Sequence, residues 1–243
     1  MTPSSISPVP PPLPGRPIIG QRWSDITFLH WRVDPARVAP LLPEGTRPDV
    51  FDGAAWVGLI PFLLSRTRIP PGPPIPWLGT FPETNVRLYS VDETGRRGVV
   101  FASLDAAHLV PVLTARAVFG LPYRWAGMRM ERRGDRIAYR SRRHSRNGPS
   151  SHVIARVLDE AVTADPLADF LTARWGFHQR HLGNTCFGPN SHRPWPLQRA
   201  ELLHLDDDLL AAAGFPDLAS RPPDSALYSR GVDTVFSRPI PVA

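Results

Sequence analysis

The segment FPETNVRLY covers residues 81–89, and from residue 83 on its more polar side chains fall on alternate positions. From residue 83 on, the odd positions hold Glu83, Asn85, Arg87 and Tyr89, whereas the even positions hold Thr, Val and Leu. Successive side chains of a β-strand point to opposite faces of a sheet, so the pattern predicts a strand. Its more polar face is either exposed to solvent or forms the wall of a polar cavity. In a cavity, Glu83 could act as an acid–base group and Arg87 as an anion clamp.

Further strands are predicted on both sides of this segment. Residues 54–64 are apolar at both alternating sets, which is typical of a strand buried on both faces, and Asp52-Gly53 before them is a hairpin signal. The other predicted strands cover residues 23–33, 98–106, 151–161, 177–185, 197–205 and 227–236, with a hairpin over 124–145 that turns at 133–135. Short helices are predicted after Asp34-Pro35, over 110–119, from Asp165-Pro166 to about Trp175, and over 207–213. Because strands and helices do not alternate regularly, we expect a mainly β (α+β), antiparallel domain, barrel-like or strongly curved, with a few peripheral helices.

The N-terminal residues 1–20 (MTPSSISPVPPPLPGRPIIG) have a different composition from the rest of the chain. Such a proline-rich segment favours extended geometry and cannot build a core. We therefore expect a flexible arm over residues 1–20 and a single domain over residues 21–243.

The chain contains no lysine, and all 28 of its basic residues are arginine. Schiff-base enzymes, pyridoxal phosphate enzymes, kinases and proteins with a Walker A loop all need a lysine, so these classes are excluded. The dinucleotide-binding motif Gly-x-Gly-x-x-Gly and the nucleophile motif Gly-x-Ser-x-Gly are also missing from the sequence.

Cysteine and histidine give no sign of a redox or metal site. Cys186 is the single cysteine, so it forms no internal disulfide, and we expect a structural thiol. His178 and His181 are three positions apart, and on a strand such residues point to opposite faces. No metal and no cofactor are therefore expected. With no signal peptide and no run of 18 uncharged apolar residues, the predicted location is the cytoplasm, without membrane contact.

Residues 129–146 (RMERRGDRIAYRSRRHSR) are rich in arginine. With a net charge of +6, the chain could use such a segment to bind nucleic acid. Arg140, Arg142 and His144 alternate with Tyr139, Ser141 and Arg143, however, which is typical of a hairpin exposed to solvent. The expected interpretation is a basic surface hairpin, and nucleic acid is not the expected partner.

Six motifs together resemble the YqjF-like bacterial family, which belongs to the acetoacetate decarboxylase-like superfamily. They are WSDITFLHWRVDPARVAPLLPEG (23–45), FDGAAWVGLIPF (51–62), FPETNVRLY (81–89), ARAVFGLPYR (115–124), HRPWPLQRAE (192–201) and YSRGVDTVF (228–236). The resemblance covers residues 22–238 and implies an antiparallel β-barrel or cone that encloses a small-molecule cavity.

The resemblance also implies site residues. The decarboxylase has a Gly/Tyr-x-Pro-Lys-Lys-type motif, in which the second lysine lowers the pKa of the first and the first forms the Schiff base. Here the stretch is GLPYR (120–124), so Tyr123 stands at the position of the nucleophile and Arg124 at that of its partner. The resemblance places Glu83 in the cavity as the family's acid and Arg22 as a pocket cation. Arg87, Arg116 and Asn85 complete the predicted substrate-binding set.

The sequence therefore predicts a cavity protein that binds an organic acid or a polyketide-like carbonyl compound without Schiff-base chemistry. As an enzyme, a decarboxylase, isomerase or cyclase, it would use Glu83 as base, Tyr123 as donor to an oxyanion, and Arg22 or Arg124 as carboxylate clamp. The alternative is a non-catalytic binding or sensing module on the same scaffold. Whether the chain is catalytic, which ligand it takes and whether it forms a homo-oligomer are open at this stage.

Overall fold

The computed structural model describes residues 6–77, 79–109 and 120–242. The strands are β1 Ile19–Val33, β2 Thr46–Pro48, β3 Ala55–Arg68, β4 Phe81–Asp92, β5 Arg97–Ala106, β6 Tyr123–Arg133, β7 Arg136–Arg143, β8 Ser150–Ala161, β9 Gly176–His181, β10 Asn184–His192, β11 Leu197–Asp207, β12 Ser225–Phe236 and β13 Ile240–Pro241. The helices are α1 Pro35–Val38, α3 Pro166–Thr172 and α4 Leu209–Ala212, with 3-10 turns η1 Ala39–Leu41 and η2 Leu218–Ser220. None of these helices is long and apolar enough to cross a membrane. The mainly β prediction is confirmed.

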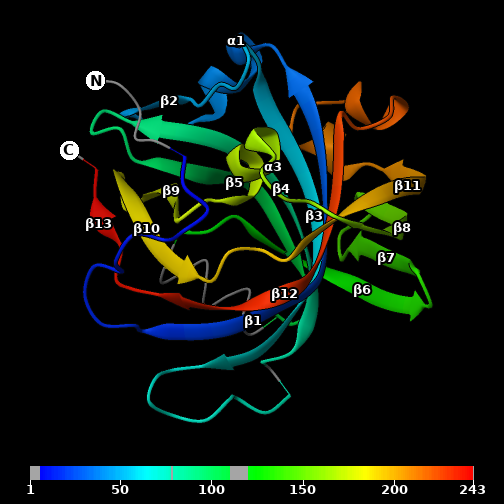
Figure 1. Ribbon diagram of the computed structural model, residues 1–243, viewed down its shortest axis with the longest axis horizontal. Helices are drawn as coiled ribbons and strands as arrows, with labels where there is room; N and C mark the ends of the chain where they lie inside the picture. Colours follow the sequence, from blue (N-terminus) through cyan, green and yellow to red (C-terminus); the bar gives the residue numbers. More distant parts are fainter. Residues whose placement is uncertain (1–5, 78, 110–119, 243) are drawn as a thin grey trace.

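All of these strands lie in one mixed sheet, in the order β13-β10-β9-β5-β6-β7-β8-β11-β12-β1-β3-β4-β2. Two additional pairings, β4 with β5 and β10 with β12, join strands that are far apart in this order. The sheet therefore curves round a central volume and has the form of a cone rather than a regular closed barrel. Among the described strand pairs, β5–β6 and β5–β9 are parallel and the others are antiparallel. Figure 1 shows β1 and β12 side by side, with α3 over β4 and with β6, β7 and β8 at one side.

Local sequence signals explain how several elements begin. Asp34 and Asp165 each precede a proline and accept hydrogen bonds from the first backbone N–H groups of α1 and α3, as predicted. Asp52 and Gly53 both have positive φ, 51° and 73°, and they turn the chain into β3, where the hairpin was predicted. Strand β3 is buried along most of its length, in agreement with its unbroken apolar run.

Two predicted elements differ in the structure, and a third cannot be compared with it. The single strand predicted over 177–185 is a hairpin, in which β9 and β10 join at Leu182 and Gly183, both with positive φ. Helix α3 ends at Thr172, before the predicted end at Trp175. The helix predicted over 110–119 lies outside the described residues.

The end of the predicted N-terminal arm takes part in the folded structure. Strand β1 begins at Ile19, where the arm was expected to continue, and the Ile18 backbone N–H donates to the Phe236 carbonyl at 2.8 Å. Farther towards the N-terminus, the Trp175 indole N–H donates to the Ser7 carbonyl at 3.0 Å. The boundary of the folded part therefore lies before Gly20, and flexibility of the residues before Ile18 stays a prediction.

Candidate functional site

A cavity of about 160 Å³ lies inside the curved sheet and is lined mostly by apolar and aromatic side chains. Strands β1, β3, β4, β5, β6, β9, β10 and β12 contribute to its wall. The polar side chains that line it are Gln21, Glu83, Asn85, Arg87, Tyr123, Thr172, Arg174, Asn190, His192 and Ser237. An apolar pocket with a few convergent polar groups is the usual form of a small-molecule site.

Glu83 and Tyr123 meet at one side of the cavity. The Tyr123 hydroxyl donates a hydrogen bond to Glu83 Oε2 at 3.0 Å, and the Glu83 side chain is almost fully buried. Strand alternation on β4 places Glu83, Asn85 and Arg87 on the cavity face, as the polar pattern of residues 83–89 allowed. Tyr123 comes from the first position of β6, which runs parallel to β5 at that point.

Burial raises the pKa of Glu83 from its ordinary value of 4.5 to about 8. The negative charge of Asp105 raises this pKa further, whereas hydrogen bonds from Tyr123 and Asn85 lower it. Glu83 is therefore mostly uncharged at pH 7. Burial also raises the pKa of Tyr123 well above its ordinary value, and the neighbouring Glu83 adds to this effect, so the phenol remains a hydrogen-bond donor.

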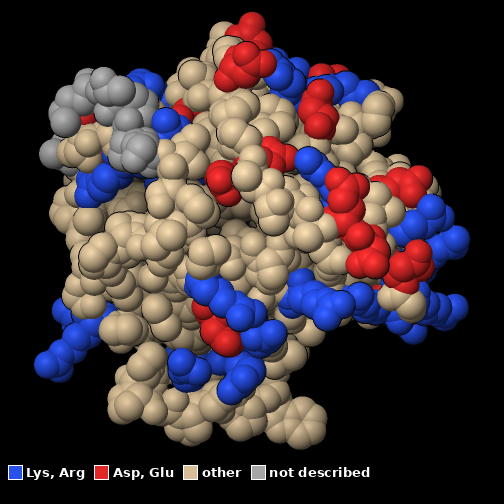
Figure 2. All heavy atoms as spheres, in the orientation of Figure 1, with Lys and Arg blue, Asp and Glu red and all other residues tan. Residues whose placement is uncertain are grey.

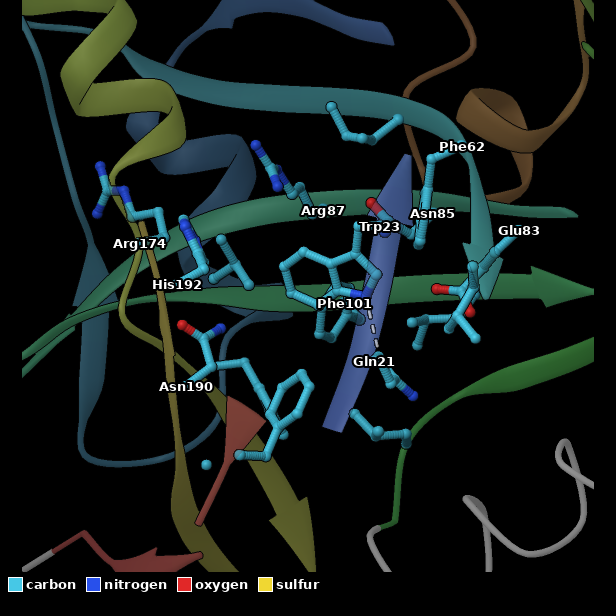
Figure 3. A pocket seen from close by; sticks show the side chains of 18 of the residues that line it. Gln21, Trp23, Phe62, Glu83, Asn85, Arg87, Phe101, Arg174, Asn190 and His192 are labelled. Atoms are coloured by element: carbon cyan, nitrogen blue, oxygen red, sulfur yellow. Dashed lines mark hydrogen bonds between the residues drawn. The ribbon is translucent and has the colours of Figure 1, made fainter. Parts of the chain in front are cut away.

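Two arginines line another part of the cavity. Arg87 donates from Nε to the Tyr89 hydroxyl and from Nη2 to the Leu171 carbonyl, both at 2.9 Å. Arg174 follows α3, is 5% exposed, donates from Nε to the Phe170 carbonyl and forms an ion pair with Asp49. Figure 3 shows Arg174 and Arg87 on the opposite side of Trp23 from Glu83.

The histidines near these arginines are uncharged at neutral pH. Burial lowers the pKa of His192, which lines the cavity, to about 4, and the charge of Arg87 contributes to the shift. The pKa of His30 is lowered well below its ordinary value by burial and then by Arg87 and Arg174. Gly58 on β3 makes room here, because a Cβ at Gly58 would lie 3.0 Å from the His30 ring and 3.2 Å from Arg87 Cγ.

Several buried polar atoms at the cavity have no hydrogen-bond partner among the described residues. They are Asn85 Oδ1, Arg174 Nη2, Asn190 Oδ1 and Ser237 Oγ. Buried polar groups are nearly always hydrogen-bonded to protein, water or ligand. Four such atoms around one cavity therefore favour an occupant with polar groups of its own.

The structure brings together four of the seven predicted site residues: Glu83, Asn85, Arg87 and Tyr123. Arg22 and Arg124 do not line the cavity, which corrects their prediction as pocket cations. Arg22 is on the opposite face of β1 from its cavity-facing neighbours and pairs with Asp233 at 3.3 Å. Arg124 follows Tyr123 on β6 and is exposed, because adjacent strand residues alternate between faces. The last predicted residue, Arg116, lies outside the described residues.

Sequence reasoning missed Arg174, Asn190 and His192. Asn190 and His192 lie on β10, whose existence depends on the unrecognised turn at Leu182 and Gly183. The Gly183-Asn184 dipeptide was an available hairpin signal. Arg174 follows the early end of α3, and its partner Asp49 is 125 positions away in the sequence, so no local pattern marks it.

The sequence offered two other candidates, a metal site and the arginine-rich segment 129–146. Within the described ranges, no group of three or more His, Cys, Asp or Glu side chains could hold a metal ion. Most of residues 129–146 form the β6–β7 hairpin, where Arg132 pairs with Asp25 at 2.7 Å and Arg143 pairs with the buried Asp105 at 2.9 Å. Figure 2 shows basic and acidic side chains interspersed on the side of the molecule where β6, β7 and β8 lie.

The model of the DUF2071 family, described as an uncharacterized conserved protein, matches residues 20–233. The curated protein YqjF of Bacillus subtilis (strain 168), itself described as uncharacterized, is 38% identical over 186 residues, which is 76% of each chain. The chain belongs to this YqjF-like family. The resemblance stated from the sequence motifs is thereby confirmed.

Solved structures share the fold at low sequence identity. An acetoacetate decarboxylase-like enzyme from Sphingomonas wittichii RW1 has a TM-score of 0.63 at 13% identity and covers 94% of each chain. A structure of acetoacetate decarboxylase has a TM-score of 0.64 at 12% identity and covers 96% of this chain and 91% of its own. The enduracididine biosynthesis enzyme MppR, complexed with the condensation product of pyruvate and imidazole 4-carboxaldehyde, has a TM-score of 0.60 at 16% identity and covers 99% of each chain. The YqjF-like chain therefore has an acetoacetate decarboxylase-like fold.

Proposed function

We propose that this YqjF-like protein binds a small carbonyl compound in its cavity and transfers protons on it without forming a covalent intermediate. The observation that carries the proposal is the buried Glu83–Tyr123 pair, a carboxyl group and a phenol in contact at the wall of a mostly apolar cavity. Acid–base catalysts are often carboxyl groups whose pKa burial has moved towards the working pH.

The reaction that suits this pair is enolisation. Ionised Glu83 accepts a proton from the carbon next to the ligand's carbonyl group, and the electrons of the broken C–H bond form the C=C bond of an enolate. Tyr123 donates a hydrogen bond to the oxygen on which negative charge develops. Glu83 then returns the proton to the same carbon, or to another carbon, in which case the ligand is isomerised.

The raised pKa of Glu83 has two consequences for this reaction. At pH 7 roughly one carboxyl in ten is ionised, which follows from a pKa about one unit above the pH. That ionised fraction is a stronger base than an exposed glutamate, because its conjugate acid holds the proton more tightly. If Glu83 is the base, the rate rises with pH up to about 8.

The missing lysine removes the covalent alternative. A phenol does not form an imine with a ketone, so Tyr123 cannot replace the Schiff-base lysine of the decarboxylase. The fold shared with MppR, which was solved with a pyruvate condensation product, supports a small carbonyl compound as the ligand class.

The second candidate function is ligand binding without turnover. It is favoured by the hydrogen bond that Tyr123 makes to Glu83, because this bond pairs the two groups with each other. A binding module needs the cavity and its polar atoms but no proton transfer.

Hydrogen–deuterium exchange at carbon separates the two functions. An oxo acid such as 6-oxoheptanoate is incubated with the protein in D₂O, and loss of the proton signals next to its carbonyl is followed by ¹H NMR. The wild type should accelerate the exchange. Glu83→Gln should abolish the acceleration, and Tyr123→Phe should slow it by about 10²-fold, as expected for loss of an oxyanion donor. Exchange at the buffer rate with wild type, or unchanged exchange with Glu83→Gln, would exclude the proposed catalysis.

A further inference from the structure

The end of the cavity that holds Arg87 and Arg174 carries more positive than negative charge. The buried carboxylate of Asp49 is shared between Arg174 and Arg97. Arg87 contacts neutral acceptors, the Tyr89 hydroxyl and the Leu171 carbonyl. Among the described residues that line the cavity, Glu83 is the one acidic side chain, and it is mostly uncharged at pH 7. An excess of buried positive charge is costly unless an anion compensates it.

Both guanidinium groups retain capacity for a ligand. Arg174 Nη2 is buried and has no acceptor in the described structure. Arg87 uses Nε and Nη2, and Nη1 has no hydrogen bond to a described residue. The two guanidinium carbons lie over the same ring, that of Tyr89, at 5.4 and 4.7 Å from its centroid. Paired guanidinium groups of this kind suit a carboxylate, which has two acceptor oxygens.

The positive end is separated from the Glu83–Tyr123 pair along β4. Glu83 and Arg87 lie four positions apart on the same strand face, so their Cα atoms are roughly 13 Å apart at the rise of a strand. The Arg87 guanidinium contacts Tyr89, farther along the strand, and therefore leans away from Glu83. Trp23 and Phe101 line the cavity between the two ends, as Figure 3 shows.

We propose that Arg87 and Arg174 bind the carboxylate of an oxo acid whose carbonyl group lies at Glu83 and Tyr123, several bonds away. This inference rests on the proposed function for the carbonyl end only. The two ends are separated by roughly 13 Å of strand, so the ligand needs a spacer of several carbon–carbon bonds between its carboxylate and its carbonyl group, as in 6-oxoheptanoate. Pyruvate and acetoacetate are too short to span this distance, because their carboxylate is attached to, or one carbon from, the carbonyl carbon.

Binding of matched ligands to the wild type tests the inference. Isothermal titration calorimetry compares 6-oxoheptanoate with its methyl ester, which keeps the chain and carbonyl and lacks the charge, and with acetoacetate. The acid should bind at least about tenfold more tightly than either, which corresponds to about 1.4 kcal/mol. Equal affinity of acid and ester, or equal affinity of acetoacetate, would overturn the proposal.

A pair of arginine variants locates the carboxylate. Arg87→Gln should remove the preference for acid over ester and leave the affinity for the ester unchanged. Arg124→Gln is the matched control, because Arg124 is exposed and does not line the cavity, and it should retain the full preference. An equal loss of acid and ester affinity in Arg87→Gln would contradict a specific carboxylate contact. Should Arg87→Gln fail to fold, the comparison of acid and ester on the wild type decides the question alone.

The outcomes separate this inference from the proposed function. An acid preference without any carbon-bound hydrogen exchange supports the carboxylate site and excludes the proposed catalysis. The opposite result is an ester that binds as tightly as the acid and exchanges its carbon-bound hydrogen as fast at matched saturation. It would support the catalysis and exclude the carboxylate site.

Discussion

Glu83 owes its raised pKa to the residues around it rather than to its own strand. Burial is the largest cause, and the negative charge of Asp105 on the neighbouring strand β5 acts in the same direction. Arg143 holds Asp105 through hydrogen bonds from Nε and Nη2, so the salt bridge partly compensates this charge. Tyr123 and Asn85 oppose the shift by hydrogen bonding. The neutral carboxyl is thus the sum of contributions from several strands.

The pKa of Glu83 predicts how stability depends on pH. Because the pKa is about 8 in the folded chain and near 4.5 when exposed, the folded state binds more protons between these values. The contribution of Glu83 to the free energy of unfolding is therefore fully present below pH 4.5 and is lost as the pH rises to 8. Between pH 5 and 8 the loss is up to about 4 kcal/mol. Glu83→Gln should remove this loss.

Chemical denaturation at pH 5, 6.5 and 8 measures the effect. The free energy of unfolding of the wild type should fall with pH relative to that of Glu83→Gln. Glu93→Gln, a change at an exposed glutamate, is the control and should follow the wild type. Parallel curves for wild type and Glu83→Gln would show that Glu83 is ionised in the folded protein.

The residues that the sequence could identify are those with a local pattern. Glu83, Asn85 and Arg87 follow the alternation of one strand, and Tyr123 follows from a family motif. Arg22 and Arg124 were misplaced because a shift of one residue moves a side chain to the other face of a sheet. Arg174 depends on long-range contacts with Asp49, which no local pattern encodes.

At the scale of elements, the start of β1 closes part of the cavity. Ile18 and Ile19 line it, and Ile19 and Gly20 pair with Phe236 and Val235 of β12. The residues before them contribute less to the fold, with one hydrogen bond from Trp175 to Ser7 and the contact of Ile6 with an apolar cluster.

Two N-terminal deletions should therefore behave differently. Removal of residues 1–15 should lower the melting temperature by less than about 4 °C, because only about one hydrogen bond and the contact of the half-buried Ile6 are lost. Removal of residues 1–20 should lower it by more than about 5 °C, because strand pairing and cavity lining are lost as well. Differential scanning calorimetry measures both. Identical melting temperatures for the two deletions would show that Ile18 and Ile19 contribute nothing to the fold.

Most of the longer strands were predictable from alternation, caps and turns, and the β9–β10 hairpin is an informative exception. Strands β9 and β10 form a hairpin whose turn includes Leu182, a non-glycine residue with φ of 50°. Leucine rarely adopts this conformation, so the local signal for the turn was the adjacent Gly183-Asn184, which the prediction did not use. The cavity residues of β10 were missed together with that turn.

At the scale of the molecule, the curved sheet produces the site by bringing distant strands to one volume. The first strand, the β4–β5 pair, the start of β6 and the C-terminal strands β10 and β12 all face the cavity. The mainly antiparallel fold followed from the order of predicted strands. The pairings of β10 with β12 and of β5 with β9 could not be predicted from this order, because no turn or other local sequence signal links the paired strands.

In this lysine-free cavity, burial keeps the Glu83 carboxyl group mostly uncharged at neutral pH beside Tyr123. The chain has six glutamates, so selective ¹³C labelling of glutamate carboxyls gives a simple NMR spectrum that can be titrated from pH 3 to 9. We expect one signal to titrate near pH 8 and to be missing from Glu83→Gln. A Glu83 signal that titrates near pH 4.5 would contradict this expectation.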